Sequence, residues 1–266
     1  MKPRGWAFAG LACGLLGGVI AFAPAAWLAS AVATQTQGRL LLADARGTVW
    51  AGSARMLLSG GADSRDAVAL PGRLLWSLGL HGMALELRAR QACCIAGTLR
   101  LQVRPGFGRL ALTLPAPAAD AAPALIGQWP LSWLAGLGTP WNTLQLGGQL
   151  ALSSPGLRLE SVQGRWRLAG SATFDLQDVA SRVSRLAPLG SYRLVLEGGA
   201  AGGAPALLRL STLQGALQLQ ADGQWSTGGL RLRGEARAAP GTEAALDNLL
   251  NIIGRRNGAL SVLSIG

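Results

Sequence analysis

Alternation of apolar and polar residues with a period of two is the feature that most restricts how this chain of 266 residues can fold. The alternating runs lie between residues 83 and 233, and the segment 99–104 (LRLQVR) is a clear example. Leucines share one parity of each run, whereas arginine, glutamine or glutamate occupies the other. Because successive side chains of a strand point to opposite faces, such a run predicts a strand with one face in the core and one in water. Strands of this kind are typical of antiparallel sheets.

Glycine-containing breaks separate the runs at intervals of about 8–12 residues, which predicts hairpins and meanders. Glycines also stand inside the runs, at Gly148, Gly170, Gly223 and Gly234. An interior glycine often marks a bulge or a bend, so a large sheet could curl over its own apolar face. We therefore predict a mainly β fold in which roughly ten to thirteen strands form a large curled antiparallel sheet, either sandwich-like or an open roll.

Two or three short helices complete the predicted fold. The segment 175–186 has leucine and valine at helical spacing, acidic residues at its start and arginines near its end. A second helix would begin at Thr242 as its N-cap and end at Gly254. A shorter third helix is expected near residues 130–137.

A long uncharged segment near the N-terminus predicts a membrane anchor. No charged residue occurs from Gly5 to Gly38, and the apolar part exceeds the ~20 residues that a spanning helix needs. Because Lys2 and Arg4 precede it, the positive-inside rule keeps the N-terminus cytoplasmic and places the rest of the chain across the membrane. The expected anchor residues are Trp6, Leu11, Leu15, Leu16, Val19, Ile20, Phe22 and Leu28.

A cleaved signal peptide is the competing interpretation, because small residues at 29–33 resemble a cleavage site. The apolar segment is longer than the ~7–15 residues of a signal-peptide core, which favours an uncleaved signal-anchor. The predicted organisation is therefore a cytoplasmic stub and transmembrane anchor over 1–37 and a β-rich domain over 38–266. A proline-rich and alanine-rich stretch at 115–123 suggests lobes 38–115 and 124–266, and one continuous sheet is the alternative.

Charge and residue chemistry argue against several classes of function. The formal net charge is +11, but the arginines are spread over the polar faces of strands, and no basic block or nucleic-acid-binding motif accompanies them. The single histidine, His81, lies in a strand-like run, and no group of histidine, cysteine and carboxylate residues has the spacing of a metal site. We predict that the protein is not an enzyme, uses no cofactor and does not bind nucleic acid.

Cys93 and Cys94 are adjacent in the sequence, and neighbouring cysteines bridge only with strained geometry. The part of the chain after the anchor contains no other cysteine. Three states remain open: a bridge between the two, two reduced thiols, or a bridge to another chain.

Four motifs occur in order along the chain: GTVWAGSA at 47–54, PWNTL at 140–144, PLGSYRL at 188–194 and LLNIIGRRNG at 249–258. With the N-terminal anchor, they resemble the type II secretion system protein N family over nearly the whole chain. The cysteine doublet departs from the family pattern. The motif positions that carry the resemblance are Trp50, Gly52, Trp141, Asn142, Pro188, Gly190, Tyr192, Asn251, Gly254, Arg255 and Arg256.

The resemblance implies an accessory subunit that is anchored in the bacterial inner membrane by one pass, has its bulk in the periplasm and supports export of folded proteins across the outer membrane. Its implied partners are other secretion-system subunits, in the inner-membrane platform or the outer-membrane secretin. From the residues themselves, Trp50 and Trp141 are expected to pack into the core. Arg255 and Arg256 are expected either to complement a helix end or to contact the membrane or an acidic partner.

A lipid-handling protein is the rival hypothesis. A long sheet that is curled by glycines and lined with leucine would form an apolar groove, and β folds do enclose lipids. The repeated alternation is also similar to that of the periplasmic parts of AsmA-like lipid-transport proteins. Lipid is therefore the alternative partner.

Overall fold

One antiparallel sheet of 16 strands organises the residues that the computed structural model describes, which are 4–82, 84–116, 123–162, 165–199, 204–226 and 229–265. The strands are β1 (Leu40–Gly47), β2 (Ala51–Ser59), β3 (Ala67–Ala69), β4 (Leu74–His81), β5 (Ala84–Arg90), β6 (Leu99–Gly106), β7 (Arg109–Leu114), β8 (Ala124–Pro130), β9 (Leu146–Val162), β10 (Arg165–Ser181), β11 (Gly190–Glu197), β12 (Ala206–Gly215), β13 (Leu217–Ser226), β14 (Gly229–Ala238), β15 (Arg255–Asn257) and β16 (Leu260–Ile265).

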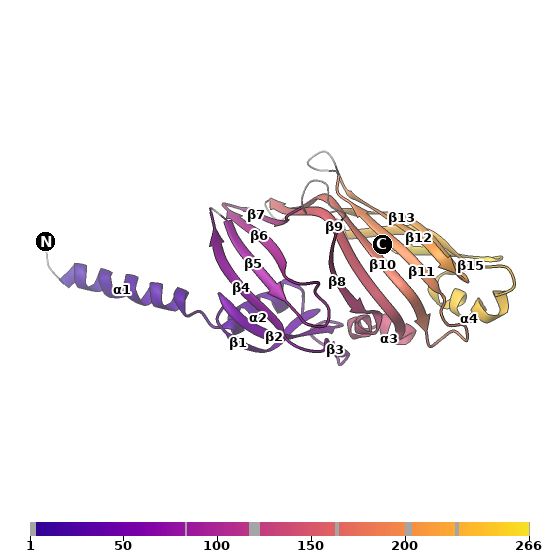
Figure 1. Cartoon of the computed structure of the whole chain (residues 1–266), viewed down its shortest axis with the longest axis horizontal. Helices are drawn as coiled ribbons and strands as arrows, with labels where there is room; N and C mark the ends of the chain where they lie inside the picture. The colour runs from indigo at the N-terminus through magenta and orange to yellow at the C-terminus, as the bar shows by residue number, and fades with distance from the viewer. Residues whose placement is uncertain are drawn as a thin grey trace.

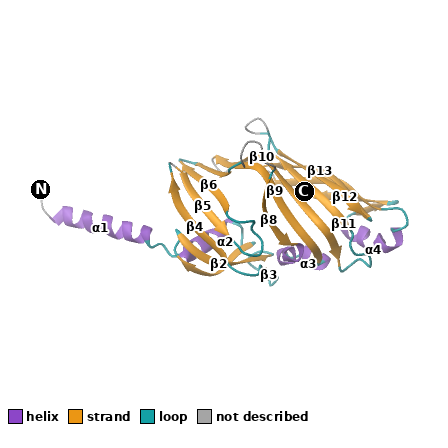
Figure 2. Cartoon of the chain, viewed as in Figure 1, coloured by secondary structure: helices purple, strands orange, loops and turns teal. Residues whose placement is uncertain are grey.

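Most strands pair with their neighbours in sequence, so the sheet is a long meander that curls from β1 at one end to β15 at the other (Figures 1 and 2). The predicted mainly β, antiparallel fold is confirmed, and the sheet is open. The expected number of strands was too low, because three-residue strands such as β3 and β15 are too short to show alternation. Met83 and residues 117–122 of the predicted linker lie outside the described residues.

The two faces of the sheet differ as the alternation predicted. Cross-strand partners on the inner face are aliphatic or glycine, and the pairs form the rows Leu78–Leu87–Leu101, Val103–Leu112–Leu159–Leu168 and Ala172–Leu196–Leu208–Gly223–Leu232. On the outer face, Arg209 is opposite Asp222, and Asp222 is opposite Arg233. Polar partners of opposite charge are favourable at such positions.

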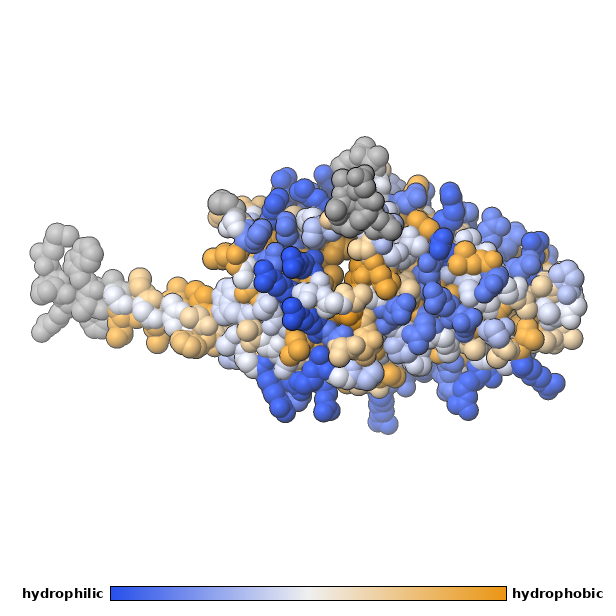
Figure 3. Space-filling model, in the orientation of Figure 1, coloured by the Kyte–Doolittle hydropathy of each residue, from blue (hydrophilic) through white to orange (hydrophobic). Residues whose placement is uncertain are grey.

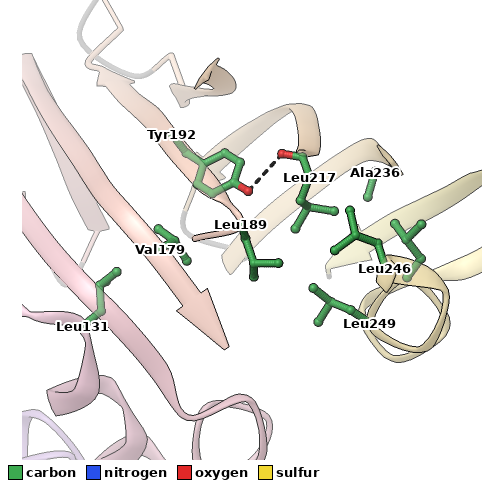
Figure 4. Packing of buried hydrophobic residues seen from close by; sticks show 9 residues of the cluster. Leu131, Val179, Leu189, Tyr192, Leu217, Ala236, Leu246 and Leu249 are labelled. Carbon is green, nitrogen blue, oxygen red and sulfur yellow. Dashed lines mark hydrogen bonds between the residues drawn. The ribbon is translucent and has the colours of Figure 1, made fainter. Parts of the chain in front are cut away.

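The main core lies where two helical segments cover one end of the inner face. These segments are η1 (Leu131–Leu137), a 3₁₀-helix, and α4 (Glu243–Ile253). Figure 4 shows Leu246 and Leu249 of α4 pointing toward Leu217 and Leu189 of the sheet and its turns. Both helices were predicted, and Thr242 is the N-cap residue of α4, although its hydroxyl donates backwards to the Ala239 carbonyl at 2.7 Å.

A second, smaller core forms at the N-terminal end of the sheet. There α2 (Ala25–Gln35) packs its buried Ala25 against Ala54 of β2 and Trp76 of β4. Leu28 of α2 joins this cluster. Leu28 was expected to be part of the membrane anchor, so its position in a protein core is a correction.

The predicted single N-terminal helix is divided in two. The helix α1 (Arg4–Ala21) ends just before Pro24, which is the N-cap of α2. A proline inside a helix removes a backbone hydrogen bond and clashes with the preceding turn, so the chain bends there. No helix formed by the described residues is long and apolar enough to cross a membrane.

The predicted helix over 175–186 is also wrong. These residues continue strand β10 to Ser181 and then form a turn. The register shifts between Leu176 and Val179, and Asp178 has a φ of 49°, so a bulge lies between two residues that both face the core. The bulge produces the spacing of three residues that resembled a helix.

Candidate functional site

Three of the four sequence motifs meet on one side of the sheet where successive strands begin or end. We call this row of strand ends the helix-bearing edge. It comprises the connections 131–145, 182–189 and 239–254, where β9 begins, β10 ends, β11 begins and β14 ends. In Figure 1, α3 (Trp141–Leu144) and α4 both lie along this edge. Antiparallel order brings these connections together although about 100 residues separate the first from the last.

The GTVWAGSA motif instead lies at the β1–β2 turn and holds the end of α1. Trp50 donates its indole N–H to the Ile20 carbonyl at 2.8 Å, and the Val49 amide donates to Ala23 at 2.9 Å. The last carbonyls of a helix lack partners within the helix, so Trp50 satisfies one of them. Trp50 is half-buried, and its role is to join α1 to the sheet rather than to fill a core.

Gly52 of the same motif permits a close approach between strands. A Cβ atom at this position would lie 2.5 Å from the Trp76 ring and 2.6 Å from the Arg46 carbonyl oxygen. The Trp76 indole in turn donates to the Val49 carbonyl at 3.1 Å. Gly52 therefore lets Trp76 pack beneath the turn that binds α1.

The PLGSYRL motif has a structural role as well. Pro188 follows a cis peptide bond, and a side chain at Gly190 would lie 2.5 Å from the Gln214 carbonyl oxygen. Tyr192 is 2% exposed and donates to the Leu217 carbonyl at 2.9 Å (Figure 4). Burial raises the pKa of the Tyr192 hydroxyl, so this group stays a neutral donor.

The LLNIIGRRNG motif closes the main core at the other end of the edge. Leu249 and Leu250 are buried, whereas Asn251 is exposed on α4. Gly254 ends α4, and a Cβ atom there would lie 2.6 Å from the Val262 carbonyl oxygen.

The two arginines of this motif differ in their surroundings. Arg256 forms an ion pair of 2.8 Å with Asp247, a side chain inside α4 rather than at its end. Arg255 is exposed on β15, which lies at the end of the sheet order. The exposed guanidinium of Arg255 therefore remains open to a membrane surface or to an acidic partner.

The PWNTL motif borders a cleft and is the best candidate for a functional site. Asn142 donates its side-chain N–H to the Asp66 carboxylate at 2.9 Å, so α3 is tied to the connection that precedes β3. Trp133 of η1 donates to the Val68 carbonyl at 3.0 Å. Trp141 is 36% exposed, which differs from the core position expected for it.

The cleft has a volume of about 500 Å³ and lies between β3, η1, α3 and the turn after β10. Its polar lining groups come from Arg65, Asp66, Ser132, Asn142, Gln145 and Arg182. The Arg182 guanidinium donates to the Gln145 side chain at 2.8 Å. Two guanidinium groups beside amide and hydroxyl groups form a surface that suits a peptide carboxylate or backbone carbonyls.

Sequence reasoning found Asn142 of this cleft and missed Arg65, Asp66 and Arg182. Asp66 and Asn142 are 76 residues apart, and Arg182 comes from the segment that was predicted as helix. These cleft residues lie in separate connections, and they come together only when the strands that these connections join are paired in the sheet. Among the described residues, no cluster of histidine, cysteine and carboxylate groups could hold a metal ion.

Ion pairs elsewhere on the surface shift the pKa values of two carboxyl groups. Hydrogen bonds from Arg73 and then from Arg46 lower the pKa of Asp44. A hydrogen bond from Arg88 lowers the pKa of Glu86. The Arg73–Asp44 pair joins the residue before β4 to β1, whereas Arg46 and Arg88 lie on the same strands as Asp44 and Glu86; all three contacts favour carboxylates that are ionised at neutral pH.

Cys93 and Cys94 form a disulfide with each other, with an S–S distance of 2.09 Å. Of the three states left open by the sequence, the structure has this one. The bridge lies in the connection between β5 and β6.

Comparison with known protein families shows the family to which the chain belongs. The sequence model described as "Type II secretion system (T2SS), protein N" matches residues 38–262. The chain belongs to the type II secretion system protein N family. Thus the resemblance based on four motifs is confirmed, and all four motifs lie within the matched region. No curated protein and no solved structure matches the chain at a significant level. The protein N match makes the chain a component of type II secretion.

Proposed function

We propose that this protein N family member is an accessory subunit held at the bacterial inner membrane by α1, which presents the cleft beside Asn142 to other secretion subunits in the periplasm. The observation that carries the proposal is the position of the cleft. It is bordered by the PWNTL motif, which lies inside the region that the family matches, and it is open to solvent with two arginines in its lining. The protein would support export of folded proteins through contacts with its partners.

The exposed apolar surface of α1 supports attachment to a membrane. Leu11, Leu15, Leu16 and Phe22 are between 66% and 78% exposed, and Ile20 is 52% exposed. Figure 3 shows the described part of α1 extending from the body with mainly apolar or weakly polar residues. Exposed apolar surface of this extent marks an interaction site, and for a helix near basic N-terminal residues a bilayer is the fitting environment.

The residues around the cleft support a contact with another protein. Tryptophan and arginine dominate the binding energy of many interfaces, and Trp141 and Arg182 are both exposed here. Arg65 and Arg182 both line the cleft, from the connection before β3 and from the turn after β10. An acidic or carboxylate-bearing segment of a partner subunit would complement them.

Complementation of a deletion strain tests this role. We expect Arg182→Glu to reduce the secreted amount of an exoprotein by about tenfold, with accumulation in the periplasm, because it places a repulsive charge in the cleft. The matched control is Arg55→Glu on β2, which is exposed and does not line the cleft. Normal secretion in the Arg182→Glu strain would contradict a role for the cleft.

Lipid handling is the second candidate, and the inner face of the sheet favours it. The two cores cover only parts of that face, and many of its other leucines, such as Leu196, Leu208 and Leu232, are only half-buried. The hollow near the middle of Figure 3 is lined by apolar residues. Phospholipid that copurifies in the absence of detergent with residues 24–266, which keep α2 and its contacts with Ala54 and Trp76, would support this function, and lipid-free protein would argue against it.

A further inference from the structure

The sheet contains a seam where one strand replaces another beside β9. The C-terminal part of β9 pairs with β7, and Leu114 of β7 is opposite Leu157. The N-terminal part of β9 pairs with β8, and Ala124 of β8 is opposite Ser154. The other side of β8 is contacted by the connection between β5 and β6, which we call the seam loop (residues 91–98).

Backbone hydrogen bonds join the seam loop to β8. The Gln128 amide donates to the Cys94 carbonyl at 2.8 Å, and the Ala96 amide donates to the Ile126 carbonyl at 3.0 Å. Ile95 and Gly127 form an isolated antiparallel bridge between these bonds. The seam loop therefore acts as one more short strand that ties the N-terminal part of the sheet to β8.

Gly127 shows how close this contact is. A Cβ atom at position 127 would clash with the Cys94 carbonyl oxygen and would lie 2.7 Å from the Trp129 ring. The contact between the seam loop and β8 thus requires a residue without a side chain at position 127, next to the Cys94 carbonyl. The carbonyl that accepts the Gln128 amide belongs to a disulfide-bonded cysteine.

The disulfide between Cys93 and Cys94 cannot stabilise the fold in the way that most disulfides do. A disulfide stabilises a fold mainly by closing a long loop of the unfolded chain, and neighbouring residues enclose almost no loop. What the bridge does constrain is the local backbone, because the small ring includes the peptide bond between the two cysteines. The ring restricts the rotations about the Cys93 Cα–C bond and the Cys94 N–Cα bond, and so it limits the direction in which the chain continues from Cys94 into the segment that pairs with β8.

We propose that the Cys93–Cys94 disulfide is a redox-sensitive latch: the oxidised ring holds the seam loop on β8, and reduction releases it. Cys93 is exposed, whereas Cys94 is 5% exposed. A dithiol reductant can therefore attack the Cys93 sulfur, with the Cys94 sulfur as leaving group that takes up a proton. The second thiol of the reductant then displaces the Cys93 sulfur, which leaves two cysteine thiols on this chain and a disulfide on the reductant.

Hydrogen–deuterium exchange on the full chain tests the latch, with dithiothreitol as the dithiol. We expect the Ala96 and Gln128 amides to exchange at least about tenfold faster in the reduced protein, because release of the seam loop breaks both hydrogen bonds. The Leu217 amide, which donates to the Leu189 carbonyl at 3.0 Å away from the seam, should not change. A Cys93→Ser, Cys94→Ser double variant should show the fast exchange with and without dithiothreitol.

Two results would overturn the proposal. One is unchanged exchange at Ala96 and Gln128 after thiol labelling has shown complete reduction. The other is a disulfide that dithiothreitol reduces in the unfolded chain but not in the folded chain. The variant Gly127→Ala supplies a control that does not alter the cysteines, and it should accelerate the same two amides even in the oxidised protein. Amide exchange in the reduced protein, in the double cysteine variant and in Gly127→Ala can be measured without any secretion assay. These results therefore do not depend on the proposed function.

Discussion

A Leu246→Ala variant is expected to have a free energy of unfolding about 3 kcal/mol lower than that of the parent chain. Leu246 has no exposed surface and lies in the main core with Leu217 and Tyr192. Its truncation removes apolar contacts and leaves a cavity that the surrounding sheet can only partly fill. Urea unfolding followed by tryptophan fluorescence would measure the loss as a lower midpoint with an unchanged slope.

The matched control is Ile252→Ala on the same helix. Ile252 is 46% exposed, so its truncation should cost less than about 1 kcal/mol. Equal losses for the two variants would mean that α4 does not pack on the sheet through Leu246. Because α4 follows β14 and precedes β15, loss of its packing should also loosen the end of the sheet.

A Leu16→Arg variant is expected to move the protein from the membrane fraction to the soluble fraction. Leu16 is 66% exposed in the C-terminal half of α1, and an arginine that must enter the hydrocarbon of a bilayer costs about 3 kcal/mol. A penalty of this size corresponds to about a hundredfold shift in the insertion equilibrium. Fractionation of cells that express the full chain, followed by carbonate washing, would measure the change.

The control for this prediction adds the same charge to the neighbouring helix. Thr34→Arg lies on the exposed side of α2, which packs on the sheet, so it should leave membrane attachment unchanged. If the Leu16→Arg protein remained in the membrane fraction at the parent level, α1 would not be the anchor. Release of both variants would instead point to a general loss of folding.

The sheet could be predicted from the sequence because each strand carries its own pattern. The parity of Leu85 and Leu87 against Glu86 and Arg88 needs no knowledge of the neighbouring strands. Helix α4 was also predictable, since its leucines and its end at Gly254 are local signals. The prediction failed at Leu176 and Val179, where a bulge inside a strand imitates helical spacing and only the pairing with both neighbours reveals the strand.

The candidate site depends on contacts that no local pattern records. Asp66 and Asn142 meet because β2, β3 and η1 lie side by side, and the sequence gives no sign of this pairing. The break of the N-terminal segment was in principle visible at Pro24, but the apolar length of the whole segment outweighed that signal. Likewise, the adjacency of Cys93 and Cys94 in the sequence allowed a disulfide between them. It gave no sign that these residues lie in a loop that pairs with β8.

Photo-crosslinking from the cleft in living cells tests the central claim most directly. A photoreactive amino acid at Ser132, which lines the cleft, would capture whichever protein contacts it, and the same probe at Arg55 on β2 is the control. We predict adducts with other type II secretion subunits from position 132 and none from position 55. Recovery of lipid-pathway proteins alone, or the absence of any secretion-subunit adduct from position 132, would contradict the claim.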